Sequence, residues 1–369
     1  MKILQIGKFY PIRGGVEKVM YDLTEGISKQ GIPCDMLCAS EKEQTIELNE
    51  NGRVMCTPIW FKAAATTISP KMVSTLRKMV KEYDVIHVHH PDPMACWALY
   101  LSGYKGKVVL HWHSDILKQR WLLQLYRPLQ SWLIHRADMI VGTSPVYLAE
   151  SPYLKSVQNK TLCVPIGIDP MVRDEQGAAE LHKRYAGKRI VFSMGRLIGY
   201  KGYEYLVKAA KYLSDDFVVI IGGTGPLMAD LQNKISLWNL QDKVKLLGFV
   251  RDEEVAAYYT ACDLFCLPSV MKTEAFGIVQ IEAMSCGKPV VTTKIPESGV
   301  SWVNTDGLSG LNVEPRDAKA LAEAIVKVTD NPEKYHKFSE GARRHFEEMF
   351  TKPKMIQTCL DLYKKLLEV

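Results

Sequence analysis

The sequence predicts an α/β protein with two domains, each built around a parallel sheet. Short runs rich in β-branched residues alternate with longer segments of helical periodicity along the whole chain. These runs are apolar throughout, which is typical of parallel strands that helices cover on both faces. The alternation starts again near Lys188, and 369 residues are more than one hydrophobic core usually holds.

Ten segments are expected to be strands, namely 2–6, 84–88, 108–111, 139–141, 161–164, 189–193, 217–221, 245–247, 264–267 and 289–293. Helices are expected between them, for example over 16–30, 203–213, 227–237, 252–261 and 318–329. The tail 335–369 has helical periodicity with a break near 351–353.

The domain boundary is expected where the polar stretch 173–187 follows the turn-forming segment 165–170. The predicted domains are therefore 1–170 and 171–350, with a C-terminal helix at 351–369 that packs back on the first domain. In open α/β sheets the ligand lies beyond the carboxyl ends of the strands, so a ligand is expected in a cleft that both sheets face.

Composition excludes several classes of function. Forty-seven basic and 41 acidic residues give a net charge of +6, which is too small a surplus to indicate a nucleic-acid-binding protein. Nine cysteines include no Cys-x-x-Cys pair, so neither a disulfide framework nor a zinc ribbon is indicated. No uninterrupted apolar run reaches the roughly 20 residues that span a bilayer. A cytoplasmic protein with reduced thiols is expected.

The segment from Glu274 to Glu282 is the most informative one about function. Gly277 between them lets backbone approach a ligand, and the amides of Ile278 and Val279 would begin a helix whose N-terminus attracts phosphate. Glu282 follows Ile278 by one helical turn and can lie on the same face. Two carboxylates around an anion site suit a nucleotide sugar, which has hydroxyls at both ends and phosphates between. The alternative is a buried amphipathic helix with solvated glutamates.

Cations and glycines follow other predicted strands. Arg196 and Lys201 come directly after the first strand of the second domain, next to Gly195, where the Arg fork and the Lys charge would suit a diphosphate. Gly225 lies in a glycine-rich segment after the next strand and is a weaker signal. Gly14 and Gly15 precede a helix in the first domain, where a phosphate-approach loop and a plain tight turn are both possible.

Five histidines end two neighbouring predicted strands: His87, His89, His90, His111 and His113. Metal ligation, structural packing and substrate contact all remain open for them. No acidic or cysteine partner stands at a usual metal spacing, so no metal site is assigned. His113 is the candidate for substrate contact because Ser114 and Asp115 continue as a loop on the expected ligand side.

In sequence order these pieces resemble the retaining, GT-B-fold glycosyltransferases of family 4, the group 1 glycosyltransferases. The resemblance covers nearly the whole chain and rests on Gly14-Gly15, His111-Trp112-His113, Ser144-Pro145 after Arg136-Ala137-Asp138, Gly195-Arg196, Lys201-Gly202, Gly222–Pro226 and Glu274-x7-Glu282. Thr224 departs from the pattern, because the family often has an acidic residue there. The resemblance implies two Rossmann-like domains that face each other across a cleft, with the acceptor on the N-terminal side and the donor on the C-terminal side.

The resemblance also implies a role for each matching residue. Arg196, Lys201, Glu274 and His113 would be the catalytic set, with the two cations on the donor diphosphate, Glu274 on the transferred sugar and His113 near the sugar and the acceptor. Glu282 would bind the ribose hydroxyls. The donor-binding set would be Gly14, Gly15, Gly195, Gly225, Val250, Phe276, Gly277, Ile278, Val279 and Glu282.

The expected activity is transfer of a sugar from a UDP- or GDP-sugar to a hydroxyl of a glycan or lipid-linked saccharide, in cell-surface polysaccharide or glycolipid assembly. Retention of the anomeric configuration and independence of metal and other cofactors are expected. An NDP-sugar epimerase and a non-catalytic nucleotide-sugar-binding protein are the alternatives.

A basic amphipathic helix is expected around Lys71, Arg77, Lys78 and Lys81, just after Trp60 and Phe61. Such a helix can rest on anionic lipid, at about 1 kcal/mol for each basic residue near the surface. Peripheral contact with the cytoplasmic face of the inner membrane is thus one expectation. An ordinary packed helix with solvated lysines is the other.

Overall fold

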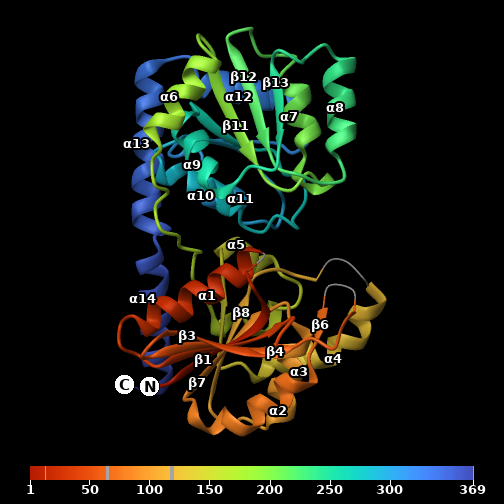
Figure 1. The fold of residues 1–369 in the computed structure, drawn as a ribbon, viewed down its shortest axis with the longest axis vertical. Helices are drawn as coiled ribbons and strands as arrows, with labels where there is room; N and C mark the ends of the chain where they lie inside the picture. The colour runs from red at the N-terminus through yellow and green to blue at the C-terminus, as the bar shows by residue number, and fades with distance from the viewer. Residues whose placement is uncertain (13, 64–65, 117–119, 369) are drawn as a thin grey trace. The chain divides into compact units, whose positions relative to one another are not determined.

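The structure is a computed structural model that describes residues 1–12, 14–63, 66–116 and 120–368. It consists of two compact units, each with its own sheet (Figure 1). Unit 1 comprises Met1–Gly167 together with the chain from Lys352 onward, and unit 2 comprises Ile168–Thr351. The chain therefore passes from unit 1 to unit 2 and returns.

Unit 1 contains an eight-stranded sheet in the order β10-β9-β8-β7-β1-β2-β4-β3. Its neighbouring strands pair in parallel except β3 and β4, which are antiparallel. The strands are β1 (Ile3–Tyr10), β2 (Cys34–Ser40), β3 (Gln44–Asn49), β4 (Gly52–Pro58), β7 (Val85–His90), β8 (Lys107–Trp112), β9 (Met139–Gly142) and β10 (Thr161–Cys163). A separate hairpin pairs β5 (Phe61–Ala63) with β6 (Thr66–Ile68).

Helices cover both faces of the unit 1 sheet. Figure 1 shows α1 (Gly15–Ser28) and α14 (Lys352–Leu367) along one face, with α2 (Pro70–Met79), α3 (Pro93–Ser102) and α4 (Arg120–Arg136) along the other. The remaining helical segments of the unit are η1 (Val80–Glu82), α5 (Pro145–Glu150) and η2 (Lys155–Lys160). The central parallel strands β1, β2, β7 and β8, which carry apolar side chains toward both layers, are almost wholly buried.

Unit 2 contains a six-stranded, fully parallel sheet in the order β13-β12-β11-β14-β15-β16. Its first strand in sequence lies beside the fourth, which is the strand order of a Rossmann-type sheet. The strands are β11 (Arg189–Met194), β12 (Phe217–Gly222), β13 (Val244–Gly248), β14 (Leu264–Leu267), β15 (Val290–Thr293) and β16 (Gly310–Val313). The α/β class with parallel sheets is confirmed.

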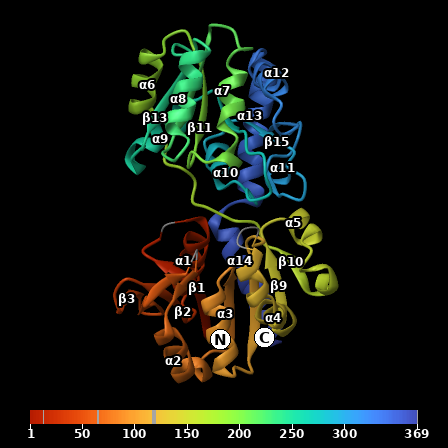
Figure 2. The ribbon, with the colours of Figure 1, turned by 90° about the vertical axis from the view of Figure 1, so that its right-hand side faces the viewer.

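The helices of unit 2 also form two layers, seen from a second side in Figure 2. One layer holds α7 (Tyr203–Ala209), α8 (Met228–Leu237) and α12 (Ala318–Thr329), whose apolar faces join the sheet in one core with Leu206, Leu231 and Ile325. In the other, α6 (Glu175–Arg184) contacts α9 (Asp252–Ala261), and α10 (Ile278–Ser285) contacts α13 (Pro332–Met349). The remaining helical segments are η3 (Gly199–Lys201) and α11 (Val300–Val303).

Two local expectations need correction. The polar stretch 173–187, read as a connection, contains helix α6, which Asp174 begins by accepting a hydrogen bond from the Gly177 amide and which packs on α9. The expected strands also omit β2, β3, β4, β5, β6 and β16. Of these, β2 contains no β-branched residue. Every residue of β2 is nevertheless buried, and its Asp35 is compensated by the hydroxyl of Tyr83 at 2.6 Å and by Arg53.

The apolar side of α2 is packed inside unit 1 rather than presented to a lipid surface. Met72 and Leu76 are fully buried, and Met79 and Val80 nearly so. The apolar side chains of 71–81 therefore pack within unit 1, as in an ordinary packed helix. No helix among the residues that the structure describes combines the length and the apolar character that crossing a bilayer requires.

Candidate active site

The candidate site of unit 2 lies where strand order reverses, between neighbouring strands β11 and β14. The loop after β11 carries Arg196 and Lys201, and the loop after β14 carries Glu274 before α10 begins. Helices leave such a pair of strands in opposite directions, which opens a crevice at their carboxyl ends. The fold thus brings together residues that are more than 70 positions apart in sequence.

Glycines allow the loop after β11 to approach its neighbours. Gly202 has φ +68, and a Cβ there would come within 2.1 Å of the Pro268 carbonyl oxygen in the loop after β14. Gly195 has φ +150, and its Cβ would lie 2.8 Å from the Tyr203 hydroxyl and 3.5 Å from the Lys201 ammonium. A side chain at Gly202 would force the two loops apart, and one at Gly195 would displace Tyr203 and Lys201.

Lys201 and Glu274 form an ion pair at the centre of this arrangement. The Lys201 ammonium lies 2.5 Å from Glu274 Oε2, and only 12% and 11% of the two side chains are exposed. Ser269 donates a hydrogen bond of 3.1 Å to the same carboxylate oxygen. A pair so far removed from water is costly unless its charges are compensated, and each charge here compensates the other. Arg196, in contrast, is exposed, and no described residue pairs with its guanidinium.

Helix α10 points its N-terminus toward the same loop. Gly277 begins it with φ +77, where a Cβ would meet Leu267 Cδ2 at 2.6 Å. The amides of Ile278 and Val279 lie in the first turn and have no acceptor within the helix, so they can bind an anion. The side chain of Phe276 is buried edge-on against Phe350, with ring centroids 5.9 Å apart, which leaves its backbone as the part that could face a ligand.

Glu282 lies one turn into α10 and is partly buried. The hydroxyl of Tyr259 donates a hydrogen bond of 2.6 Å to its carboxylate. Burial raises the pKa of Glu282, while the Tyr259 hydrogen bond and the Lys201 charge act in the opposite direction. An acid held in this way can accept hydrogen bonds from hydroxyl groups.

The glycine-rich segment after β12 packs directly on the loop after β11. A Cβ at Gly223 would come within 2.0 Å of the Gly195 carbonyl oxygen, and a Cβ at Gly225 within 2.4 Å of the Leu197 carbonyl oxygen. Val250 is buried and lies against Gly222. These residues shape the loop that carries Arg196, and the packing alone requires glycine at 223 and 225.

Two partners of the acids were not identified from the sequence. Ser269 follows β14 directly and lies five residues before Glu274, so its place at a strand end was a usable signal. Tyr259 lies in a different helix from Glu282, with nothing in its sequence context that indicates the contact. The hydrogen bond depends on how α9 and α10 pack.

In unit 1 the predicted site residues follow β1 and β8. Gly14 is the N-cap of α1, and both Gly14 and Gly15 are exposed. His113 follows β8 and is 5% exposed, whereas His87, His89 and His111 are fully buried. Asp115 of the same loop accepts hydrogen bonds from the Trp112 indole and the Ser151 hydroxyl, so it stabilises the loop.

The buried histidines do not have the arrangement of a metal centre. Ring nitrogens of His87, His89 and His111 lie within 4.8 Å of one another. However, the three rings are stacked nearly parallel, with interplanar angles of 14–28°. Their nitrogen lone pairs, which lie in the ring planes, therefore do not point at one common position. Both nitrogens of His89 are already hydrogen-bonded, to Gln5 and to His113, so His89 offers no lone pair for an ion.

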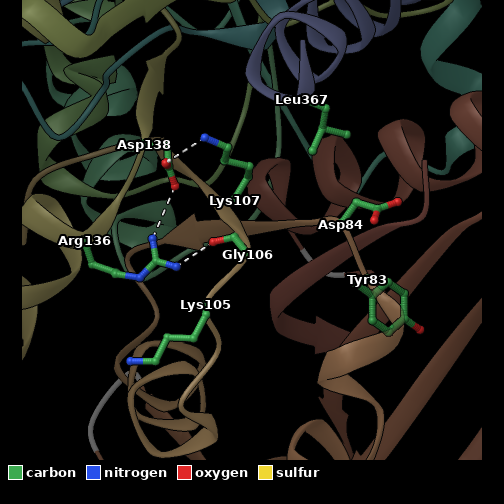
Figure 3. A pocket seen from close by; sticks show the side chains of 8 residues that line it. All are labelled: Tyr83, Asp84, Lys105, Gly106, Lys107, Arg136, Asp138 and Leu367. Atoms are coloured by element: carbon green, nitrogen blue, oxygen red, sulfur yellow. Dashed lines mark hydrogen bonds and ion pairs between the residues drawn. The ribbon is translucent and has the colours of Figure 1, made fainter. Parts of the chain in front are cut away.

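A cavity of about 470 Å³ lies at the amino ends of β7, β8 and β9, away from His113, which follows the carboxyl end of β8 (Figure 3). It is lined by Tyr83, Asp84, Lys105, Gly106, Lys107, Arg136, Asp138 and Leu367. Its charges are largely paired within the protein, since Arg136 and Lys107 both contact Asp138.

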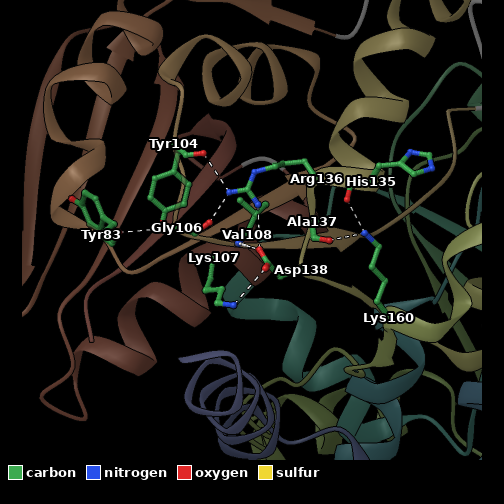
Figure 4. Close-up of polar contacts among 10 residues, drawn as sticks. All are labelled: Tyr83, Tyr104, Gly106, Lys107, Val108, His135, Arg136, Ala137, Asp138 and Lys160. Carbon is green, nitrogen blue, oxygen red and sulfur yellow. Dashed lines mark hydrogen bonds and ion pairs between the residues drawn. The ribbon is translucent and has the colours of Figure 1, made fainter. Parts of the chain in front are cut away.

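The polar contacts in Figure 4 show what these cations do. Arg136 ends α4 and donates to the carbonyl oxygens of Gly106 and Tyr104, at 2.6 and 3.3 Å. Lys160 donates to the carbonyl oxygens of His135 and Ala137. Lys160 thus compensates carbonyl groups at the C-terminus of α4 that lack helical partners, and Arg136 holds the loop before β8. This region therefore stabilises the fold and is not a second candidate site.

Comparisons with known families match both halves of the chain. Residues 13–171 match the family described as "Glycosyltransferase Family 4", and residues 177–345 match the family described as "Glycosyl transferases group 1". The chain is 34% identical to the O-antigen chain mannosyltransferase C of Escherichia coli, over 100% of this chain and 99% of that protein. It is 31% identical to the D-rhamnosyltransferase WbpZ of Pseudomonas aeruginosa, over 95% of this chain and 92% of that protein.

Solved structures show the same fold at lower sequence identity. Sucrose-phosphate synthase from Thermosynechococcus elongatus superposes with a TM-score of 0.77 and 22% identity, with 100% of each chain covered. HepE of Anabaena, in complex with UDP, superposes with a TM-score of 0.79 and 20% identity, with 99% of this chain and 100% of that one covered.

Proposed function

Since the chain belongs to the group 1, family 4 type of glycosyltransferases with the GT-B fold, we propose that it moves a hexose from a nucleoside-diphosphate sugar to a hydroxyl of a glycan or lipid-linked saccharide. Its place among these transferases is shown by full-length similarity above 30% identity. The donor, the stereochemistry and the site residues belong to the proposal.

The observation that carries the proposal is the Lys201–Glu274 pair at the point where strand order reverses, beside the N-terminus of α10. In the proposed complex Lys201 and Arg196 hold the donor diphosphate, assisted by the amides of Ile278 and Val279. Glu274, already oriented by Lys201 and Ser269, accepts hydrogen bonds from hydroxyls of the transferred sugar. Glu282 accepts hydrogen bonds from the ribose.

The donor contacts extend through backbone and through unit 1. Gly195, Gly225, Val250, Phe276 and Gly277 border the nucleotide in the proposal. Gly14, Gly15 and His113 are the residues of unit 1 that we propose to contact the substrates.

The chemistry follows from where charge develops. Breaking the sugar–phosphate bond places positive charge on the anomeric carbon and negative charge on the departing diphosphate. Arg196 and Lys201 stabilise that negative charge more strongly in the transition state than in the ground state, which lowers the barrier. The departing phosphate oxygen accepts the proton of the acceptor hydroxyl as the new bond forms on the same face. The anomeric configuration is then retained, and no metal ion is required.

Relatives narrow the substrate class. The two similar proteins are named for transfer of mannose and of D-rhamnose, and the first for the O-antigen chain. D-rhamnose is 6-deoxy-D-mannose, so we propose a donor sugar of the mannose configuration and a polysaccharide or glycolipid acceptor. HepE was solved with UDP-glucose, which supports a nucleotide sugar and leaves both UDP- and GDP-sugars to be tested.

We also propose peripheral contact with a membrane, made by residues outside the buried apolar side of α2. Trp60 and Phe61 are 78% and 55% exposed and precede that helix. Exposed aromatic side chains beside lysines suit the boundary between lipid headgroups and water. The catalytic step would then take place at the cytoplasmic face of a membrane.

The epimerase and the non-catalytic alternatives are not favoured, because the full-length relatives are named as transferases. An epimerase would change the donor sugar without an acceptor. A non-catalytic protein would bind the donor and leave it intact. Incubation of purified protein with donor alone, and then with acceptor, separates the three functions.

The first test identifies the donor and then removes one cation of the proposed site. Thermal shift with UDP-, GDP- and ADP-sugars, among them GDP-mannose, should identify the donor. Lys201→Met should then lower kcat on the order of 10²–10³, because one preorganised cation is lost from the transition state. Lys208→Met removes an exposed positive charge from α7 and should leave kcat within about twofold, since surface charges contribute little.

The second test uses the product. NMR of the transferred sugar should show the anomeric configuration of the donor, and EDTA should leave the rate unchanged. An inverted product would exclude the same-face step. Loss of activity in EDTA with recovery on adding Mg²⁺ would exclude the metal-free diphosphate site.

A further inference from the structure

Unit 1 contains a stack of imidazole rings beside His113 that the proposed function does not use. His87 and His89 of β7 lie on the same side of the sheet as His111 and His113, and neighbouring ring centroids are 3.9–5.2 Å apart. Helix α14 covers them, and its Tyr363 contacts His87 edge-on. All of these rings come from unit 1.

A continuous hydrogen-bonded chain runs through part of this stack. His113 Nε2 lies 2.9 Å from His89 Nδ1, and His89 Nε2 lies 2.8 Å from Gln5 Oε1. The Gln5 amide donates to the Tyr363 hydroxyl at 3.2 Å, and that hydroxyl lies 2.5 Å from His87 Nδ1. These hydrogen bonds therefore join β1, β7, the residue that follows β8, and helix α14.

With the Gln5 amide nitrogen directed at Tyr363 and its oxygen at His89, one placement of protons is consistent along these contacts. The Gln5 amide nitrogen donates to Tyr363, so its carbonyl oxygen faces His89 and can only accept. His89 then carries its proton on Nε2, and its Nδ1 is a bare acceptor. His113 must donate to it from Nε2, which leaves the lone pair of His113 Nδ1 free to accept.

Burial favours the neutral form of the imidazole rings in this hydrogen-bonded chain. Desolvation lowers the pKa of His87, His89 and His113 well below the ordinary histidine value, and the neighbouring imidazoles lower it further. A neutral imidazole has one N–H and one lone pair, as the proton placement requires.

We propose that Gln5, His89 and Tyr363 are positioning residues that hold His113 as its Nε2–H tautomer, with Nδ1 as a fixed hydrogen-bond acceptor for a hydroxyl of the sugar or the acceptor. The inference rests on the proposed function for what His113 contacts. The tautomer itself depends only on the contacts within unit 1.

The structure distinguishes His113 from the rest of the stack in a way that suits this role. His113 is 5% exposed, whereas the rings behind it are fully buried. The Nε2–H tautomer is set from within the protein, so the acceptor lone pair is in place before a substrate arrives. Orientation of this kind is how hydrogen-bonded partners tune a functional histidine.

The direct experiment is long-range ¹H–¹⁵N NMR on the full-length protein labelled with ¹⁵N-histidine. Protonated and bare ring nitrogens differ widely in ¹⁵N shift, so each tautomer is read without a substrate. His113→Gln and His89→Gln assign the two signals by their disappearance. Both rings should be neutral with the proton on Nε2. A proton on Nδ1 of His113, or a charged His113 ring at neutral pH, would overturn the inference.

A pair of variants tests whether the chain acts on the reaction. Gln5→Met keeps the approximate shape but removes the acceptor for His89, so His113 should show mixed tautomers and kcat should fall about tenfold, the worth of one neutral hydrogen bond. His111→Leu is the matched control, because His111 stacks on His113 without belonging to the chain. It should leave the His113 tautomer unchanged.

The outcomes separate this inference from the proposed function. The expected NMR pattern in a protein that transfers no sugar would contradict the function and leave the tautomer assignment standing. A different pattern in an active enzyme would contradict the assignment alone. Unchanged tautomers and unchanged kcat in folded Gln5→Met would remove Gln5 from the positioning set.

Discussion

At the scale of single residues, the two acids of the unit 2 site differ in how their charges are compensated. Glu274 is paired with Lys201 at 2.5 Å. Glu282 has the Tyr259 hydroxyl as its hydrogen-bond donor and a net upward shift of its pKa from burial. An ionised Glu282 is therefore a cost to the ligand-free fold, of the kind that functional sites often carry.

Replacing this acid should stabilise the protein in a pH-dependent way. The folded-state pKa of Glu282 lies above the ordinary value of 4.5, so the folded state binds the proton more tightly than the unfolded chain. The free energy of unfolding of the wild type consequently falls as pH rises through the window above 4.5. Glu282→Gln does not titrate and keeps an acceptor for Tyr259. Its melting temperature should exceed that of the wild type at pH 8.

The comparison with low pH provides the control. Well below pH 4.5, Glu282 is protonated in both states, and the advantage of Glu282→Gln should disappear. The same variant should bind the donor more weakly, because an amide is a poorer acceptor for ribose hydroxyls than a carboxylate. A variant that is less stable than the wild type at pH 8 would contradict the assigned direction of the pKa shift.

At the scale of elements, glycines decide how closely helices and loops pack in unit 2. Gly341 is buried in α13, and a Cβ there would come within 2.1 Å of the Leu308 carbonyl oxygen. Since the obstacle is backbone, a rotamer change cannot relieve it. The helix pattern of 332–349 contains no sign that this position touches a loop 33 residues earlier.

Gly341→Ala should therefore destabilise unit 2 although alanine is the better helix former. Alanine gains about 1 kcal/mol in helix propensity. Overpacking against backbone costs about 1–3 kcal/mol, and a contact this short lies at the upper end. Urea unfolding should show a lower free energy of unfolding for Gly341→Ala. Lys337→Ala, at an exposed position of the same helix, should stay within about 0.5 kcal/mol of the wild type.

The element scale also shows which local predictions could succeed. The helices at 252–261 and 318–329 were predicted with the bounds that α9 and α12 have, because the acidic first turn of α9 and the apolar periodicity of α12 are strong local signals. The helical tail with a break near Thr351 is also confirmed. Strand β2 was missed because burial, rather than residue type, stabilises it. Helix α6 was missed although Asp174 caps it and its residues are good helix formers, because its many charged side chains were taken for a connection.

At the scale of the whole molecule, the chain leaves unit 1 after Gly167 and returns to it at Lys352. Helix α14 then buries six side chains in unit 1: Met355, Ile356, Cys359, Leu360, Leu362 and Tyr363. Burying a large aliphatic or aromatic side chain contributes about 1.5–3 kcal/mol. The last helix is thus a structural part of the N-terminal unit.

Ending the chain after Thr351 should unfold unit 1 and spare unit 2. Hydrogen exchange should show that amides of β1, β7 and β8 lose their protection, because α14 no longer covers the face that carries Gln5 and His87. Amides of β11, β12 and β14 should stay protected, and the donor nucleotide should protect them further. Protection of the unit 1 strands at wild-type level in the shortened chain would refute this dependence.

The sequence by itself determined the α/β class, most strands and the family, because these depend on local periodicity and on short motifs at strand ends. Tertiary structure decided the rest: that Lys201 pairs with Glu274, that Met72 and Leu76 face inward, and that Gln5 meets Tyr363 across 358 positions of sequence. Such contacts depend on strand order and helix packing, and a linear pattern of residue types contains no measure of distance between them.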